Sequence, residues 1–266
     1  MTADGRPGEL ATAALGDPRA SPDIDWIRSL TGASAARVQE VLKETDRLVP
    51  AEAAMRKRQL DAGRSNYAQF RAPFDLYAIV RLNRPSHIVE TGVSSGISSA
   101  HFLFALRANR SGTLHSIDLP TPQIARRLAA SESIVSIPPG RTSGWAMPDD
   151  LRPGWDLHLG PSQALLPVLA QSVDSVELFL HDSLHTPEHL TFELETLRSR
   201  FPPGAVVLAD NTEWTGDAFD RFARTFGAEV LHRGGSDLVG LRVPTKRATR
   251  APRAGPRRTA RPKGKR

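Results

Sequence analysis

The sequence predicts an α/β fold: a doubly wound, mostly parallel seven-stranded sheet with helices on both faces and a terminal antiparallel hairpin. Short apolar segments alternate with longer segments of helical periodicity through the middle of the chain. The last third changes character, because two short strands lie close enough in sequence to pair as a hairpin. A chain of 266 residues with 39% hydrophobic residues can bury one core of this kind. We therefore expect a single main domain.

Helical segments are expected before the sheet, as an N-terminal cap over residues 23–84. Their apolar residues recur at helical spacing, and Pro85 marks the break before the first strand. Residues 1–22 are rich in Ala, Gly, Pro and Asp without periodicity, so we expect them to be disordered. The expected helices are Asp23–Leu30, Ser34–Leu48, Ala51–Leu60 and Tyr67–Leu82.

The alternating part of the chain, residues 85–244, is expected to form the sheet domain. The expected strands are His87–Thr91, Thr113–Asp118, Trp155–Leu159, Val176–Leu180, Ala205–Asp210, Glu229–His232 and Asp237–Val243. The expected helices are Ile97–Ala108, Gln123–Ala130, Ser162–Ala170, Pro187–Arg200 and Asp217–Phe226. The connection 131–154 is long and contains four prolines, which is typical of a functional lid.

Basic charge is concentrated at the end of the chain. Residues 245–266 carry ten Lys and Arg and no acid, so residues 1–244 have a net charge of −4 although the whole chain has +6. We expect this tail to be disordered and either simply solvated or in weak, nonspecific contact with nucleic acid. The chain has no cysteine, no run of about 18 apolar residues and no signal-peptide pattern. We expect a cytoplasmic protein without a membrane span, whose oligomeric state the sequence leaves open.

Polar clusters follow two of the expected strands. Asp182 and His185 come after one strand, and Asp210 and Asn211 end the next. The carboxyl ends of parallel strands face the crevice in which open α/β sheets bind ligands. Oxygen ligands at that edge favour a hard cation such as Mg²⁺.

The first strand leads into a glycine-containing turn typical of nucleotide binding. Gly92 and Gly96 allow a tight turn and a close backbone approach to a ligand, and Asp118 ends the second strand, where a carboxylate can accept hydrogen bonds from a ribose diol. The glycines do not follow the G-x-G-x-x-G pattern that dinucleotides require, which disfavours NAD. Such turns also occur for packing alone.

The pattern Glu90-x-Gly92-x-Ser94-x-Gly96-x-Ser98 resembles the first motif of class I S-adenosylmethionine-dependent methyltransferases. The resemblance implies a Rossmann-like fold and cofactor contacts from these five residues and Asp118. Glu90 would suit the positive charge of that cofactor.

The turn Gly160-Pro161-Ser162-Gln163 is similar to the one that holds adenine in catechol O-methyltransferase and its relatives, which would make Ser162 and Gln163 cofactor contacts. Ser162 could equally cap its helix.

In the same family, an Asp after one strand and an Asp-Asn pair after the next bind Mg²⁺, which implies Asp182, Asp210 and Asn211 as the ligands. The resemblance spans residues 85–211. His185 stands where the catechol enzyme has lysine, and it is our expected catalytic base alongside Asp182; it could instead bind the metal or cap a helix. An Asp-x-x-His strand end also resembles bacterial methyltransferases that act on sugars and natural-product hydroxyls.

We therefore expect an enzyme that transfers a methyl group from S-adenosylmethionine to a small-molecule hydroxyl, with Mg²⁺ assistance. Two alternatives remain open: methylation of RNA or another macromolecule recruited by the basic tail, and cofactor binding without turnover. Trp145 and Trp214 could line the substrate side or simply pack. We expect His181 and His189 to be structural or solvent-facing, and His101 and His115 give no site signal.

Overall fold

The computed structural model describes residues 21–62, 70–119, 137–138 and 140–245. The expected helix Gln123–Ala130, the basic tail from residue 246 and nearly all of the expected N-terminal disorder lie outside these residues.

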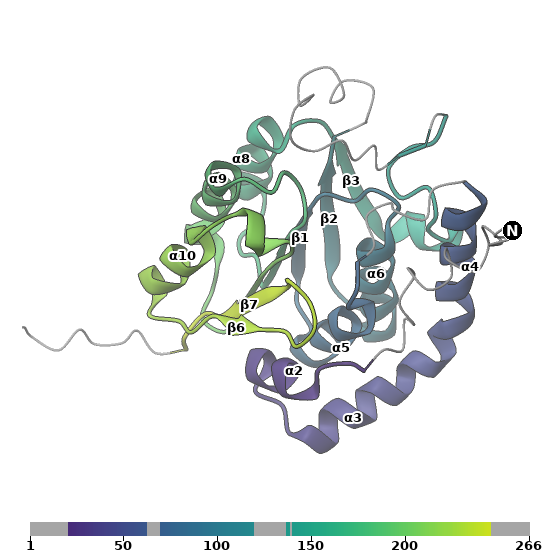
Figure 1. Cartoon of the computed structure of the whole chain (residues 1–266), viewed down its shortest axis with the longest axis horizontal. Helices are drawn as coiled ribbons and strands as arrows, with labels where there is room; N and C mark the ends of the chain where they lie inside the picture. Colours follow the sequence, from purple (N-terminus) through teal and green to yellow (C-terminus); the bar gives the residue numbers. More distant parts are fainter. Residues whose placement is uncertain (1–20, 63–69, 120–136, 139, 246–266) are drawn as a thin grey trace, which may run out of the picture.

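A seven-stranded sheet in the order β3-β2-β1-β4-β5-β7-β6 forms the centre of the protein (Figure 1). The first five strands in that order are parallel, and β7 runs antiparallel to both β5 and β6. The predicted fold class is confirmed. The strands are β1 (His87–Thr91), β2 (Thr113–Asp118), β3 (Trp155–Leu159), β4 (Leu178–His181), β5 (Val206–Ala209), β6 (Leu231–His232) and β7 (Val239–Arg242).

Strand order reverses at β1, which pairs with β2 on one side and with β4 on the other. Such a switch point opens a crevice at the carboxyl ends of the strands. The first three strands have the predicted bounds, whereas β4 begins two residues late and ends one residue late. The late start has a local cause: the N–H of Val176 donates to the carbonyl of Arg200, outside the sheet.

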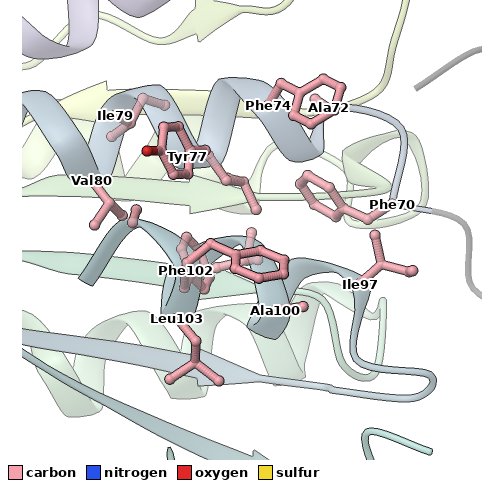
Figure 2. Packing of buried hydrophobic residues seen from close by; sticks show 14 of the residues in the cluster. Phe70, Ala72, Phe74, Tyr77, Ile79, Val80, Ile97, Ala100, Phe102 and Leu103 are labelled. Carbon is pink, nitrogen blue, oxygen red and sulfur yellow. The ribbon is translucent and has the colours of Figure 1, made fainter. Parts of the chain in front are cut away.

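Two apolar layers cover the sheet. One contains α5 and α6 with the N-terminal helices, and the other contains α8, α9 and α10. Figure 2 shows the first layer, where α5, with the buried Phe74 and Tyr77, packs beside α6, with the buried Phe102. The helices are α2 (Ile24–Thr31), α3 (Ala35–Lys43), α4 (Val49–Asp61), α5 (Pro73–Asn83), α6 (Ile97–Asn109), α8 (Ser162–Ser172), α9 (Pro187–Leu197) and α10 (Ala218–Phe226). The 3-10 turns are η1 (Glu44–Leu48), η2 (Asp149–Gly154), η3 (Arg198–Arg200) and η4 (Thr212–Trp214).

Two expected helices differ in extent. The segment 34–48 is α-helical only to Lys43 and continues as η1. The helix expected from Tyr67 begins at Pro73, where proline suits the first helical turn because its missing N–H would have no intrahelical partner. Within the described ranges, no helix is long and apolar enough to cross a membrane.

A buried ion pair joins the N-terminal helices to the hairpin. Asp75 of α5 accepts hydrogen bonds from Arg233 Nε at 3.1 Å and from the backbone N–H of Asp23 at 3.0 Å. Burial raises the pKa of Asp75, and the Arg233 charge opposes that rise. Nearby, Trp26 Nε1 donates to the carbonyl of Leu231 at 2.9 Å. The helices before the sheet are thereby fixed to its far edge.

Replacing Asp75 with alanine should leave Arg233 buried without its partner. We expect Asp75→Ala to lower the free energy of unfolding by about 3–5 kcal/mol, measured by urea denaturation. Asp25→Ala is the matched control, because the Asp25–Arg28 pair is exposed and should contribute less than about 1 kcal/mol. Equal losses in the two variants would contradict the assignment.

Candidate active site

The turn between β1 and α6 lies directly against the end of β4. Gly92 has φ +86°, and a Cβ there would lie 1.8 Å from the backbone oxygen of Asp182. Gly96 has φ +90°, and its Cβ would lie 2.8 Å from Gly144 Cα. Ser94 between them also has a positive φ, 50°. The two glycines are therefore required by close backbone approach as well as by conformation.

Glu90 lies under this turn and is fully buried on β1. Its carboxylate accepts hydrogen bonds from three serine hydroxyls: Ser98 at 2.5 Å, Ser99 at 2.6 Å and Ser116 at 2.7 Å. Burial raises its pKa to about 7, and the charge of Asp182 adds to the rise, while the hydroxyls oppose it. In this structure Glu90 and Ser98 bond to each other, inside the protein.

Asp118 ends β2 beside the same turn. Its Oδ1 accepts the N–H of Val93 at 3.3 Å, and burial raises the pKa of the carboxyl against the influence of Ser143 and neighbouring N–H groups. Its Oδ2 is buried and makes no hydrogen bond of normal geometry within the described part of the chain. This oxygen is an acceptor with capacity for a ligand hydroxyl.

Ser162 and Gln163 begin α8, directly after β3. Ser162 Oγ lies 3.1 Å from His189 Nε2, and Gln163 Nε2 lies 3.0 Å from His189 Nδ1. Ser162 makes no side-chain cap hydrogen bond to its own helix, whose N-cap is Pro161. Both predicted cofactor residues are instead held by one imidazole of α9.

Glu193 of α9 organises a buried network behind the crevice. Its Oε2 accepts hydrogen bonds from Thr91 Oγ1 at 2.6 Å and is 2.7 Å from His181 Nδ1, and its Oε1 is 2.9 Å from His189 Nε2. Ser183 Oγ donates to Oε1 at 3.1 Å. Burial would raise the pKa of Glu193, but the two histidines lower it well below its usual range. The expectation that these histidines are structural agrees with this geometry.

Asp182 and His185 follow β4 on the crevice side. His185 Nε2 lies 3.5 Å from Asp182 Oδ1, and the His185 ring meets the Trp214 ring edge-on at 5.9 Å. Trp214 is 50% exposed, so it could contact a substrate, whereas Trp145 is buried in the core. The structure therefore leaves Trp214 as a candidate substrate contact and assigns Trp145 to packing, although the sequence left the same two alternatives open for both residues.

Asp210 and Asn211 follow β5, the neighbouring parallel strand. Burial raises the pKa of Asp210 to about 7, and the Asp182 charge adds to it. Asn211 adopts a left-handed conformation, φ 51°. In the described residues the one set of three His, Asp or Glu ligands within 4.8 Å of one another lies elsewhere, so Asp182, Asp210 and His185 do not form such a set.

Helix α4 and the segment after residue 140 support the turn from the other side. Gly144 and Ala146 donate their N–H groups to the carbonyls of Ser94 and Ser95 at 2.9 and 3.0 Å. Arg58 Nη1 donates to the carbonyl of Ala146 at 2.8 Å. The predicted lid segment is thus, in its described part, hydrogen-bonded to the turn.

Sequence reasoning missed Glu193 and the role of His189. Their spacing of four residues on one helix was a readable signal, because residues i and i+4 share a helix face. Nothing in the sequence shows which neighbours that face meets.

Comparison with known families gives a match over the same residues. Residues 89–212 match a family described as "Methyltransferase domain". This span begins in β1 and ends directly after Asn211, so it contains every residue that the sequence predicts for the site. No curated protein matches the chain in sequence.

Solved structures share the fold at low sequence identity. A proposed caffeoyl-CoA O-methyltransferase from Staphylococcus aureus has a TM-score of 0.53 and 10% identity, over 79% of this chain and 99% of that one. The cofactor-bound Rv0187 from MTB has a TM-score of 0.52 and 17% identity, over 74% and 90%. A proposed O-methyltransferase from Klebsiella pneumoniae has a TM-score of 0.51 and 18% identity, over 77% and 96%.

The family match and the strand order agree with the resemblance expected from the sequence motifs. Residues 89–212 of this chain are therefore similar to a methyltransferase domain, and the sheet around them has the Rossmann-like fold of the solved methyltransferase structures.

Proposed function

We propose that this protein transfers a methyl group from S-adenosylmethionine to the hydroxyl of a small molecule, assisted by Mg²⁺. The observation that carries the proposal is the contact of Gly92 with the backbone of Asp182, which joins the turn before α6 to the polar end of β4. A cofactor on the turn and an acceptor near Asp182 would then be neighbours. The solved O-methyltransferase candidates of similar fold support transfer to oxygen.

The residues around the turn suit S-adenosylmethionine. Asp118 Oδ2 is a buried acceptor without a normal hydrogen bond in the described ranges, so it can receive a ribose hydroxyl. Gly92, Ser94 and Gly96 have positive φ values, so the backbone here turns tightly enough for a ligand to approach it closely. Ser162 and Gln163 lie at the far side, where we assign them to the adenine.

Glu90 contributes to cofactor binding by holding the turn. Both of its oxygens accept serine hydroxyls, two of them from the first turn of α6, so the carboxylate ties β1 to that helix. We assign Ser98 the same supporting role. Glu90 and Ser98 would affect cofactor affinity indirectly, by fixing the backbone conformation of residues 92–96.

Asp182, Asp210 and Asn211 suit a divalent cation with oxygen ligands. Asp182 helps to raise the pKa of Asp210, which means that the two carboxylates repel each other when both are charged. A cation between them would offset this repulsion. When bound, Mg²⁺ would lower the pKa of an acceptor hydroxyl and fix its oxygen.

His185 is the proposed base for the acceptor hydroxyl. Its Nε2 lies 3.5 Å from Asp182 Oδ1, close to the proposed cation ligands, while Asp182, Asp210 and His185 do not converge as one ligand set. This favours proton transfer over metal binding. The half-exposed Trp214 ring against His185 suits an acceptor with an apolar or aromatic face.

Removing the Asp118 carboxylate should weaken the binding of the cofactor. Because hydrogen bonds to a charged group contribute about 1.5–3 kcal/mol, Asp118→Ala should weaken S-adenosylmethionine binding roughly 10- to 100-fold in calorimetry. Asp174→Ala, at an exposed position outside the site, is the control. Wild-type protein that binds no S-adenosylmethionine would disprove the proposal.

Asp182→Ala should abolish methyl transfer to a panel of catechols and sugar hydroxyls, with a much smaller change in cofactor affinity. Chelation of divalent cations should have the same effect on the wild type, reversed by Mg²⁺. His185→Gln should lower kcat for these acceptors, with the cofactor affinity retained. Full activity in the presence of chelator would contradict the metal role.

Glu90→Gln should change how stability depends on pH. The pKa of Glu90 is raised from 4.5 to about 7, so the folded protein keeps a proton that the unfolded chain releases as pH rises through this interval. Wild-type stability should therefore fall by about 3 kcal/mol between pH 4.5 and 7 relative to Glu90→Gln. Urea denaturation at several pH values measures this difference. Glu229→Gln, an exposed change, should follow the wild type.

A further inference from the structure

We propose that His115, Asp156 and His158 form a second metal site, one that takes Zn²⁺ or a similar transition-metal ion. Asp156 and His158 lie on β3, and His115 lies on β2 directly opposite Asp156 in the parallel register. Among the described residues, these three are the set whose ligand atoms all lie within 4.8 Å of one another. The proposal does not depend on the proposed methyl transfer.

The three side chains converge on one carboxylate oxygen. His115 Nδ1 lies 2.6 Å from Asp156 Oδ2, and His158 Nε2 lies 2.9 Å from the same atom. Two imidazoles and one carboxylate are the ligand set of a tetrahedral zinc site with its fourth position open. If the Asp156 side chain moved slightly outward, an ion could bind between His115 Nδ1, His158 Nε2 and Asp156 Oδ2. Imidazole ligands favour zinc, nickel or copper over the Mg²⁺ proposed near Asp182.

The ring nitrogen of His115 that faces away from the proposed ion already has a partner. His87 Nδ1 lies 3.1 Å from His115 Nε2, and the two rings stack with centroids 5.4 Å apart. If His115 carries its proton on Nε2, that N–H donates to His87, and the lone pair of Nδ1 points to the ion. Metal-binding histidines typically have such a partner, which fixes the ring and its tautomer. His115 is buried, so this orientation is set before an ion arrives.

The site is open to solvent and separate from the candidate active site. The side chains of Asp156 and His158 are 46% and 36% exposed, so an ion can enter. His115 is three residues before Asp118, or about 10 Å along the strand. Alternation also turns His115 to the opposite face of the sheet from Ser116, which bonds Glu90. An ion here would crosslink β3, the outermost parallel strand, to β2.

Zinc binding to the untagged full-length chain tests the proposal. We expect one Zn²⁺ to bind the wild type in calorimetry and to raise its unfolding temperature, and Co²⁺ to give the absorption bands of a four-coordinate site. His158→Gln and Asp156→Asn should each remove the zinc-induced shift and the cobalt bands. His87→Phe should weaken zinc binding roughly 10- to 100-fold, because His115 would lose the partner that orients its ring.

Two controls separate this site from others. His232→Gln changes an exposed histidine on β6 and should bind zinc as the wild type does. Asp182→Asn should also retain the cobalt bands, because Asp182 belongs to the other candidate site. Circular dichroism identifies any variant that fails to fold, and His158→Gln alters a side chain that is 36% exposed. Zinc binding that survives both His158→Gln and Asp156→Asn, or that is lost in Asp182→Asn alone, would overturn the proposal.

Discussion

The close approach of Gly92 to the end of β4 is the constraint on which the candidate active site depends. A Cβ at this position would overlap the carbonyl oxygen of Asp182, so the chain can turn here only as glycine. The N–H of Asp182 donates to the carbonyl of Thr91 at 2.9 Å, which locks the two strand ends together. The relative position of the turn and the polar residues after β4 is therefore set by backbone contacts, independently of side-chain rotamers.

A buried charge network keeps the two sides of the crevice in register. Glu193 contacts Thr91 of β1, His181 of β4 and His189 of α9, and His189 in turn contacts the start of α8. Buried polar groups are costly unless they are satisfied, and a satisfied network strongly favours one arrangement over others. The ends of two strands and the beginnings of two helices thus share one set of partners.

The sequence was most informative where local chemistry decides the structure. The bounds of β1, β2 and β3 follow from short segments rich in strand-forming residues that end at Asp or directly before Gly, and they match the structure. The motifs at Gly92, Asp118 and Asp182 predicted which strand ends would gather, because parallel strands place their carboxyl ends at one edge.

Contacts between elements that are far apart along the chain could not be predicted from the sequence. The pairing of His115 with Asp156 depends on the register of two parallel strands, which no turn connects directly, and the partners of Glu193 depend on how α9 is rotated against the sheet. For the same reason, the sequence could suggest a contact between Glu90 and the cofactor but could not show that three serines use its oxygens. Side-chain partners of buried acids are set by packing.

Helix α4 has a consequence for exchanging parts between related enzymes. Arg58 donates to the carbonyl of Ala146, and Gln59 Nε2 donates to Ser95 Oγ at 2.8 Å, so a helix distant in the sequence touches the glycine turn and the segment beside it. A chimera that takes its first helices from another protein would replace these two hydrogen bonds as well. Exchanging these helices to change the acceptor would then also change the affinity for the proposed methyl donor, unless Arg58 and Gln59 are kept.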